Sequence, residues 1–280
     1  MSESPHRLPT YFVSHGGGPW PWIKDQLPGD WSVLERSLQA IPAELGTTPR
    51  AVLVVSGHWE EPQFTVQGHP QPPMLYDYGG FPEFTYRIQY PAPGSPGTAA
   101  RVAELLGAAG IAHAVDDDRG FDHGVFAPLF VMYPDADVPV LQLSIEKGYD
   151  PAEHLAAGRA IAPLRDEGVL IVGSGFTYHN LRDFGPGGEV ASRDFECWLT
   201  DALVDSSDTE RIDRLLHWEQ APGARHSHPA EDHLIPLMVV VGAAEHDPGA
   251  RIYHEDHFMD AALTSASYRF GTVPAPAPSS

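Results

Sequence analysis

Three histidines in this 280-residue sequence each follow an apolar stretch with the length and composition of a buried strand. The pairs are residues 10–14 with His15, residues 51–57 with His58, and residues 169–175 with His179. Each stretch ends in glycine or serine, which lets the chain turn out of the core. Ligands of open α/β sheets bind at the carboxyl ends of the strands, so we expect these imidazoles to converge on one site. Three separate histidines at the edge of the core would give the same pattern.

Converging imidazoles indicate a metal site. Neutral imidazole binds iron, zinc and copper, and three or four such ligands from separate segments leave coordination positions open, as catalytic sites do. His123 and His233 also adjoin turns where the chain leaves the core. His226 and His228 are intermediate candidates for the site, because they lie just before the helical stretch that carries His233. The remaining histidines are expected to be ordinary surface or half-buried residues: His6, His69, His113, His154, His217, His246, His254 and His257.

Other catalytic motifs are incomplete. The run from His15 to Gly18 matches the His-Gly-Gly-Gly oxyanion motif of some esterases, but the Gly-x-Ser-x-Gly nucleophile elbow is missing from the sequence. A dinucleotide fingerprint starting at Gly173 has Tyr178 in place of its third glycine. Cys197 lies in a helical stretch and is expected to be a packed thiol.

Apolar strands alternate with amphipathic segments along the chain, which predicts an α/β fold: a single domain with a central, largely parallel sheet flanked by helices and with histidine-bearing loops at the carboxyl ends of the strands. We expect one catalytic domain over residues 1–270 and a flexible tail over the Pro/Ala/Ser-rich residues 271–280. A helix is predicted over residues 226–245, carrying His233. Further strands are predicted at 64–66, 111–115 and 138–143, and further helices at 30–44, 97–109, 151–165, 190–204 and 208–217.

Residues 70–96 are rich in proline, glycine and aromatic side chains, which predicts a long ordered loop. The rings are Tyr76, Tyr78, Phe81, Phe84, Tyr86 and Tyr90. Beside a metal they would form a wall or lid for a flat aromatic substrate, and packing into the core is the alternative.

The composition argues against several functions. The formal net charge is −21, with 17 Lys and Arg against 38 Asp and Glu, which disfavours binding to nucleic acid or to an anionic membrane. A single cysteine rules out an intrachain disulfide. No apolar run approaches the roughly 20 residues of a membrane span, and the first residues lack the apolar core of a signal peptide. We therefore expect a cytoplasmic location; the oligomeric state is left open.

Taken together, the motifs resemble the class III extradiol ring-cleavage dioxygenases of the LigB-like superfamily, and more narrowly their DOPA-dioxygenase-like branch. The resemblance covers nearly the whole chain in the expected order, and its most specific blocks are Gly-His-Trp-Glu and His-Pro-x-x-Asp-His. The matching segments are 14–19, 56–60, 76–82, 90–94, 121–124, 174–181 and 228–236.

This resemblance implies roles for five histidines. His15, His58 and His233 would be metal ligands, with His233 in the place that a glutamate takes in distant members. His179 would be the acid–base residue and, in some zinc-loaded members, a fourth ligand; His123 would contact substrate or oxygen. Fe(II) is the expected ion, and Zn(II) also suits an all-nitrogen site.

The implied reaction inserts O2 into the ring of a catechol-type substrate and gives a ring-opened semialdehyde. Two alternatives stay open. One is a zinc-dependent hydrolase of an amide or ester, in which the metal activates water. The other is a non-catalytic binding protein of the Memo-like kind, which would be expected to lack part of the ligand set.

Overall fold

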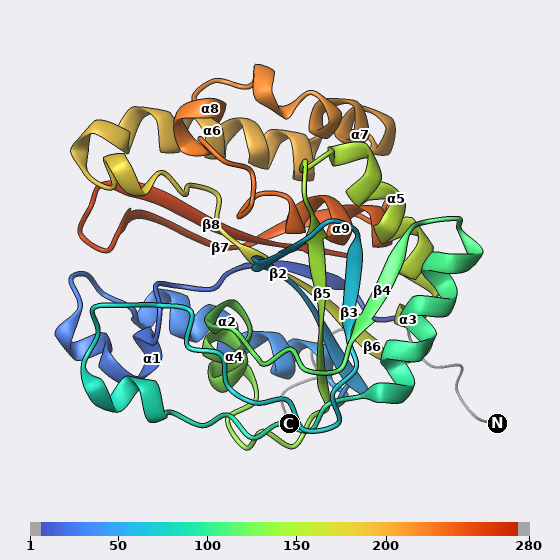
Figure 1. The fold of residues 1–280 in the computed structure, drawn as a ribbon. Coiled ribbons are helices and arrows are strands. Elements are labelled where there is room, and N and C mark those ends of the chain that lie inside the picture. The colour runs from blue at the N-terminus through green and yellow to red at the C-terminus, as the bar shows by residue number, and fades with distance from the viewer. Residues whose placement is uncertain (1–6, 274–280) are drawn as a thin grey trace, which may run out of the picture.

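The computed structural model describes residues 7–273 and has an eight-stranded sheet in the order β4-β3-β5-β2-β6-β1-β8-β7 (Figure 1). Its four central strands, β5, β2, β6 and β1, run parallel, which confirms the α/β fold with a largely parallel sheet. The strands are β1 (Thr10–Ser14), β2 (Ala51–Glu61), β3 (Phe64–Gln67), β4 (His113–Asp116), β5 (Val140–Glu146), β6 (Val169–Gly175), β7 (Gly249–Phe258) and β8 (Leu263–Phe270).

Both sides of the parallel core carry antiparallel pairings. Strand β3 pairs antiparallel with β5, and β8 pairs antiparallel with β1. Strands β7 and β8 form an antiparallel hairpin that the sequence analysis did not predict. This hairpin brings residues near the carboxyl end of the described chain beside the first strand.

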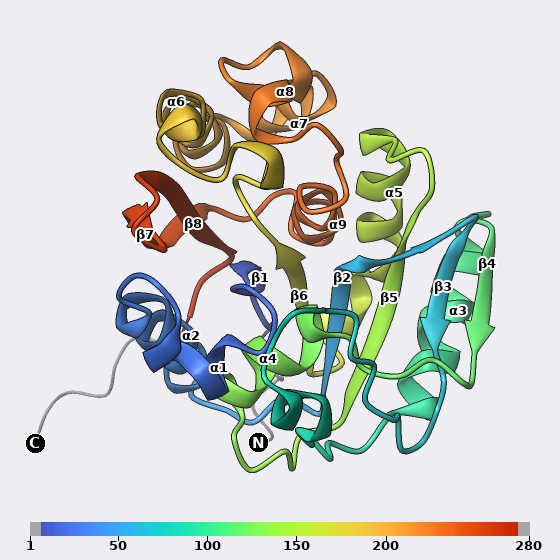
Figure 2. The ribbon, with the colours of Figure 1, turned by 60° about the vertical axis from the view of Figure 1, so that its left-hand side comes forward.

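Helices cover both faces of the sheet (Figure 2). One layer contains α1, α2 and α4, and the opposite layer contains α3, α5, α6, α7, α8 and α9. The helices are α1 (Trp20–Ile23), α2 (Ser32–Leu45), α3 (Pro96–Ala108), α4 (His123–Met132), α5 (Pro151–Ile161), α6 (Glu189–Thr200), α7 (Asp208–Leu216), α8 (Ala224–Ser227) and α9 (Pro236–Ala243). Within residues 7–273, none of these is long and apolar enough to cross a membrane.

Strand β2 shows why the central strands are apolar throughout. Leu53 and Val55 pack into the core beneath α5 and α9, whereas Val52 and Val54 pack into the core beneath α2 and α4. Successive side chains of a strand point to opposite faces, so a strand covered on both sides needs apolar residues at every position.

Two local expectations need correction. Strand β2 continues to Glu61, so His58 lies within the strand instead of after it; the strand pairing shifts register between Ser56 and Glu60. The helix predicted over 226–245 is wrong, because the chain forms the short α8, then turns, and only then α9. Pro236 starts α9, since proline lacks the N–H that a helix interior requires and restricts the residue before it. Residues 274–280 of the predicted flexible tail lie outside the described chain.

Candidate metal centre

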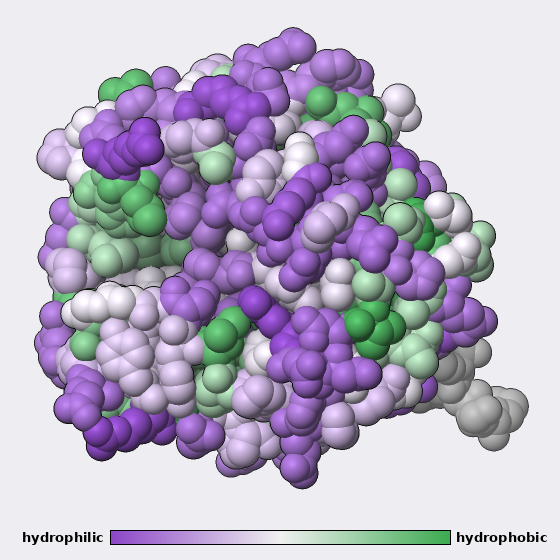
Figure 3. All heavy atoms as spheres, viewed as in Figure 1, coloured by the Kyte–Doolittle hydropathy of each residue, from purple (hydrophilic) through white to green (hydrophobic). Residues whose placement is uncertain are grey.

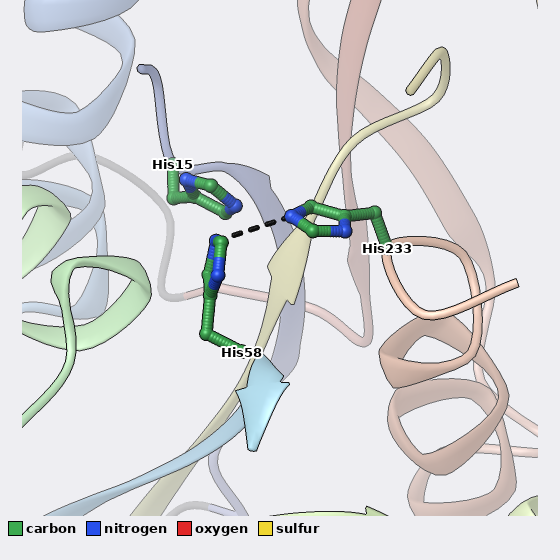
Figure 4. Close-up of side chains that lie close together, drawn as sticks. All are labelled: His15, His58 and His233. Carbon is green, nitrogen blue, oxygen red and sulfur yellow. Dashed lines mark hydrogen bonds between the residues drawn. The ribbon is translucent and has the colours of Figure 1, made fainter. Parts of the chain in front are cut away.

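Three of the predicted histidines come together at one end of the parallel strands. His15 follows β1, His58 lies in β2, and His233 lies in the turn before α9. One ring nitrogen from each lies within 4.8 Å of those of the other two. The rings point toward one another (Figure 4), with centroids 4.9 Å apart for His15 and His58 and 4.6 Å apart for His58 and His233.

The register of the sheet explains this convergence. Strand β6 lies between β1 and β2, and its last pairings join Ser14 to Gly175 and Ser56 to Ser174. The three strands therefore reach the same level at this edge of the sheet. A β-carbon on Gly57 would come within 2.8 Å of the Asp232 carbonyl oxygen, so only glycine lets the turn that carries His233 approach β2 this closely.

Hydrogen bonds orient two of the rings so that their Nε2 atoms are available. His15 Nδ1 lies 2.7 Å from the Gly16 carbonyl oxygen, which only accepts, so this nitrogen carries the proton. His233 Nδ1 lies 2.7 Å from the carboxylate of Asp232 and donates to it for the same reason. The Nε2 atom of each ring then keeps its lone pair. In metal sites, such partners set the tautomer of the ligating histidine.

Burial keeps the cluster uncharged. It lowers the pKa of His58 to about 3, and the positive charge that His123 can carry adds to this effect, whereas the Asp77 carboxylate opposes it. Burial also holds the pKa of His15 and of His233 well below the usual histidine value, and the neighbouring imidazoles reinforce the shift. All three rings are therefore neutral near pH 7, which is the form that binds a metal.

The arrangement fits a divalent metal ion. His15 Nε2 is buried and has no hydrogen-bond partner. The Nε2 atoms of His58 and His233 face each other at 3.1 Å (dashed line in Figure 4), and that of His233 carries a lone pair. A cation bound by all three nitrogens would satisfy the lone pairs of His15 and His233 together. Three imidazoles with open positions suit zinc and non-haem iron alike.

His123 and His179 lie against this cluster. The His123 ring is 4.0 Å from that of His58, centroid to centroid, and its Nδ1 donates to an Asp77 oxygen 2.8 Å away. His179 stacks on His233, with centroids 3.3 Å apart and planes inclined by 19°. Burial lowers the pKa of His179, and the carboxylate of Asp232, 4.0 Å from its Nδ1, opposes that shift. All five predicted site histidines therefore line one cavity.

That cavity has a volume of 590 Å3, within the ~300–1,000 Å3 typical of small-molecule sites. Its inner wall consists of the five histidines, Asp77 and Asp232, and the glycines at 16–18 form part of its side. The outer wall is apolar and combines the segment after β6 with the β7–β8 turn: Phe176, Leu181, Phe184, Phe258 and Met259. In Figure 3 apolar residues gather at the rim of a hollow on the left of the view.

The aromatic segment contributes to the site differently from the expectation. It forms the predicted loop, but among its residues only Asp77 lines the cavity. The hydroxyls of Tyr76 and Tyr78 donate to the carbonyl oxygens of Ile88 and Thr85, respectively, at a distance of 2.7 Å in each case. These rings therefore hold their own loop together. The segment therefore supplies a carboxylate to the histidines, and the aromatic wall comes from elsewhere.

A buried polar network supports His58 from below. Asp122 is fully buried and accepts hydrogen bonds from Ser56 Oγ at 2.8 Å and from Arg119 Nη2 at 3.0 Å. The His58 N–H donates to Ser56 Oγ, and the same Arg119 nitrogen donates to the His58 carbonyl oxygen. Both backbone polar groups of His58 are thus held by side chains.

Other histidines have structural roles or are exposed. His154 donates from Nδ1 to the Asp150 carbonyl oxygen and accepts the Glu146 N–H at Nε2, which makes it a buried core residue. His228, whose context was intermediate, is buried, with Nε2 3.0 Å from the Thr177 carbonyl oxygen. His226 is exposed and pairs with Asp183.

Sequence reasoning gave no role to Asp77 or Asp232, although both lie inside the quoted motifs. For Asp232, adjacency to His233 was a usable signal. Asp77 meets His123 across 46 positions of sequence, and no periodicity links the two. The apolar wall residues Phe258 and Met259 were missed because the β7–β8 hairpin was missed.

A separate hollow of 420 Å3 lies near Arg7, Arg159 and Arg165. Their guanidinium groups pair with Asp166, Glu245 and Asp247 respectively. Because these cations are already neutralised and the hollow contains no converging imidazoles, it lacks the chemistry of the histidine cavity.

Comparison with known proteins gives a consistent result. The family model described as "Catalytic LigB subunit of aromatic ring-opening dioxygenase" matches residues 11–271. The chain is 38% identical to a 4,5-DOPA dioxygenase extradiol of Beta vulgaris, over 93% of this chain and 96% of that protein. It is 38% identical to one of Escherichia coli, over 85% of each, and 37% identical to the dioxygenase tasH of Hapsidospora irregularis, over 89% of this chain and 82% of that protein. A crystal structure of an uncharacterized E. coli protein superposes with a TM-score of 0.76 at 32% identity, covering 95% of this chain and 100% of the other.

Proposed function

Since the chain belongs to the LigB family of aromatic ring-opening dioxygenases, we propose that it is an extradiol dioxygenase that inserts O2 into the ring of a catechol-type substrate. The product would be a ring-opened semialdehyde. The family implies an aromatic substrate and O2 as reactants; the catechol, the ion and the roles of individual histidines are parts of the proposal. So is the cytoplasmic location.

One observation carries the proposal: imidazoles from three distant segments present Nε2 atoms to one another at the base of a cavity, and two more imidazoles line that cavity. We assign His15, His58 and His233 as the metal ligands. Fe(II) held there would supply the redox chemistry that O2 requires, whereas Zn(II), which suits the same donors, has no redox chemistry.

His179 is assigned as the general base for the substrate hydroxyl. Its lowered pKa keeps the ring unprotonated near pH 7, so it can take a proton from a diol. Stacking on His233 also supports this role, because two rings that bind one ion through Nε2 point at it along different lines, whereas stacked rings lie side by side. The fourth-ligand role implied by zinc-loaded relatives is the competing assignment.

His123 is assigned to contact the bound substrate or oxygen. Its Nδ1 and its backbone N–H both donate to Asp77, at 2.8 and 3.0 Å, so its other ring nitrogen is left for a hydrogen bond within the cavity. The ring stands beside His58, and His179 lines the same cavity. Substrate or oxygen bound between the two histidines would have a proton acceptor on either side. The apolar outer wall would exclude water from that space.

The test is reconstitution of metal-free protein with Fe(II) under anaerobic conditions, followed by a panel of catechols and air. We expect O2 uptake together with a yellow ring-opened product. Protein loaded with Zn(II) is the matched control and should consume no O2. Failure of the Fe(II) protein to consume O2 with any catechol would overturn the proposal, and ester or amide hydrolysis by the Zn(II) protein would favour the hydrolase alternative.

A further inference from the structure

Asp77 contacts two histidines of the inner wall with different oxygens. Its Oδ1 accepts the backbone N–H of His123 at 3.0 Å and the Nδ1–H of the same residue at 2.8 Å. Its Oδ2 lies 3.3 Å from His58 Nδ1. Only 18% of the Asp77 side chain is exposed, although the residue as a whole is exposed through its backbone.

A carboxylate placed in this way determines where each imidazole keeps its proton. An ionised carboxylate only accepts, so its hydrogen bond with His123 favours the tautomer of that ring protonated at Nδ1, and its contact with His58 favours the same tautomer there. For His58 this contact competes with the 3.1 Å bond between the Nε2 atoms of His58 and His233, which would need the proton on His58 Nε2. We expect the carboxylate to win this competition, because hydrogen bonds to charged groups are stronger than those to neutral ones. Their Nε2 atoms then carry lone pairs. The backbone N–H and the ring N–H of His123 both donate to this carboxylate, which favours its ionised form.

We propose that Asp77 is a positioning residue that sets the tautomers of a metal ligand, His58, and of a substrate- or oxygen-facing residue, His123, at the same time. The inference rests on the proposed metal site. The hydroxyl bonds of Tyr76 and Tyr78 that fix the aromatic loop would then also fix the position of Asp77 relative to the two imidazole rings.

Asp232 differs in a way that makes the proposal testable. One of its oxygens, Oδ2, makes both of its histidine contacts, at 2.7 Å to His233 Nδ1 and 4.0 Å to His179 Nδ1. An asparagine at 232 could keep an oxygen on His233. An asparagine at 77 could not serve both rings with oxygen: if its oxygen stays on His123, its NH2 group faces His58 Nδ1, which would then have to accept. His58 would be protonated at Nε2 and lose its lone pair.

The experiment measures Zn(II) affinity of metal-free protein by competition with a chelator, for the wild type, Asp77→Asn and Asp232→Asn. We expect Asp77→Asn to weaken Zn(II) binding by roughly 10–100-fold, the usual cost of losing a residue that supports a ligand, and Asp232→Asn to weaken it less. Nitrogen NMR of the histidine rings reports the tautomers directly. In the metal-free wild type His58 should be protonated at Nδ1, and in Asp77→Asn at Nε2, with His58→Gln identifying the signal.

A third variant guards against a purely structural effect. Asp77→Ser offers His58 no amide N–H, so its Zn(II) affinity should fall less than that of Asp77→Asn. Equal losses in the two variants, an unchanged His58 tautomer in Asp77→Asn, or protonation of wild-type His58 at Nε2 would each overturn the inference. None of these measurements uses a catechol or O2, so they remain decisive even if the proposed ring cleavage fails.

Discussion

The inner and outer walls of the cavity are built from opposite kinds of side chain. The inner wall carries five imidazoles and two carboxylates, and His15 and His233 are almost fully buried there. The outer wall carries Phe176, Leu181, Phe184, Phe258 and Met259, and Leu181 is 71% exposed. Most of the inner-wall polar groups are thus shielded from water, whereas the outer wall extends from the buried Phe176 and Phe258 to the exposed Leu181.

We infer from this difference that the inner wall serves metal binding and turnover, and that the outer wall serves the choice among substrates. Buried polar groups are costly unless each has a partner, so every orientation in the inner wall is constrained. Apolar side chains at the rim need no hydrogen-bond partners, so they can differ according to the substituent that the substrate carries there. We therefore expect substitutions in the inner wall to impair metal binding or turnover, and substitution of the exposed Leu181 to change mainly the preference among substrates.

The largest effect is expected from His15→Ala. Its Nε2 is buried and has no hydrogen-bond partner within the described protein, so removing the ring would remove a proposed ligand that nothing nearby replaces. Metal content after Fe(II) reconstitution should fall steeply, and O2 uptake with catechol should be lost. Normal metal content in this variant would contradict the assignment of the inner wall as a metal site.

His179→Ala should separate the two proposed functions of the inner wall, metal binding and turnover. We expect metal content closer to wild type than in His15→Ala, with a turnover number lower by roughly 10²–10⁴-fold, the usual contribution of a general base. Metal analysis and steady-state kinetics on the same preparation provide the measurement. If this variant loses as much metal as His15→Ala, His179 is primarily a ligand.

Acid should destabilise the metal-free protein through its neutral buried histidines. The pKa of His58 in the folded protein is about 3, below the ordinary histidine value, so between those two values the unfolded chain binds a proton that the folded chain does not. The free energy of unfolding therefore falls as pH falls through this window, by about 1.4 kcal/mol per pH unit for each such histidine.

Urea denaturation at a series of pH values checks this expectation. His58→Gln should reduce the slope of stability against pH, and Leu181→Arg, in the outer wall, should leave it unchanged. A slope in His58→Gln equal to that of the wild type would show that His58 does not stay neutral in the folded protein.

The smallest effect is expected at the rim. The residues that line the cavity include no lysine or arginine, so a catechol bearing a propionate should be a poorer substrate than its methyl ester. Leu181→Arg adds a cation at an exposed position and should raise kcat/KM for the acid by about two- to fivefold, the value of an exposed ion pair, without improving the ester. Equal changes for acid and ester would mean that Leu181 does not face the substituent.

Sequence patterns were sufficient for the elements that depend on local spacing. Unbroken apolar runs predicted β1, β2 and β6, because strands covered on both faces need such runs. The histidines that follow them predicted the cluster, since parallel strands end at a common edge. The β7–β8 hairpin escaped prediction because its first strand, half-exposed and mostly polar, has no comparable apolar run.

By itself, the sequence determined the parallel core and the set of histidines at its edge, because both follow from residue type and periodicity along short segments. The tertiary structure alone decided how those histidines are used. Asp77 reaches His123 across 46 positions, and Phe258 faces the cavity only because β7 and β8 fold back beside β1. Contacts between distant segments depend on how the whole chain closes around its core, and no local pattern records that closure.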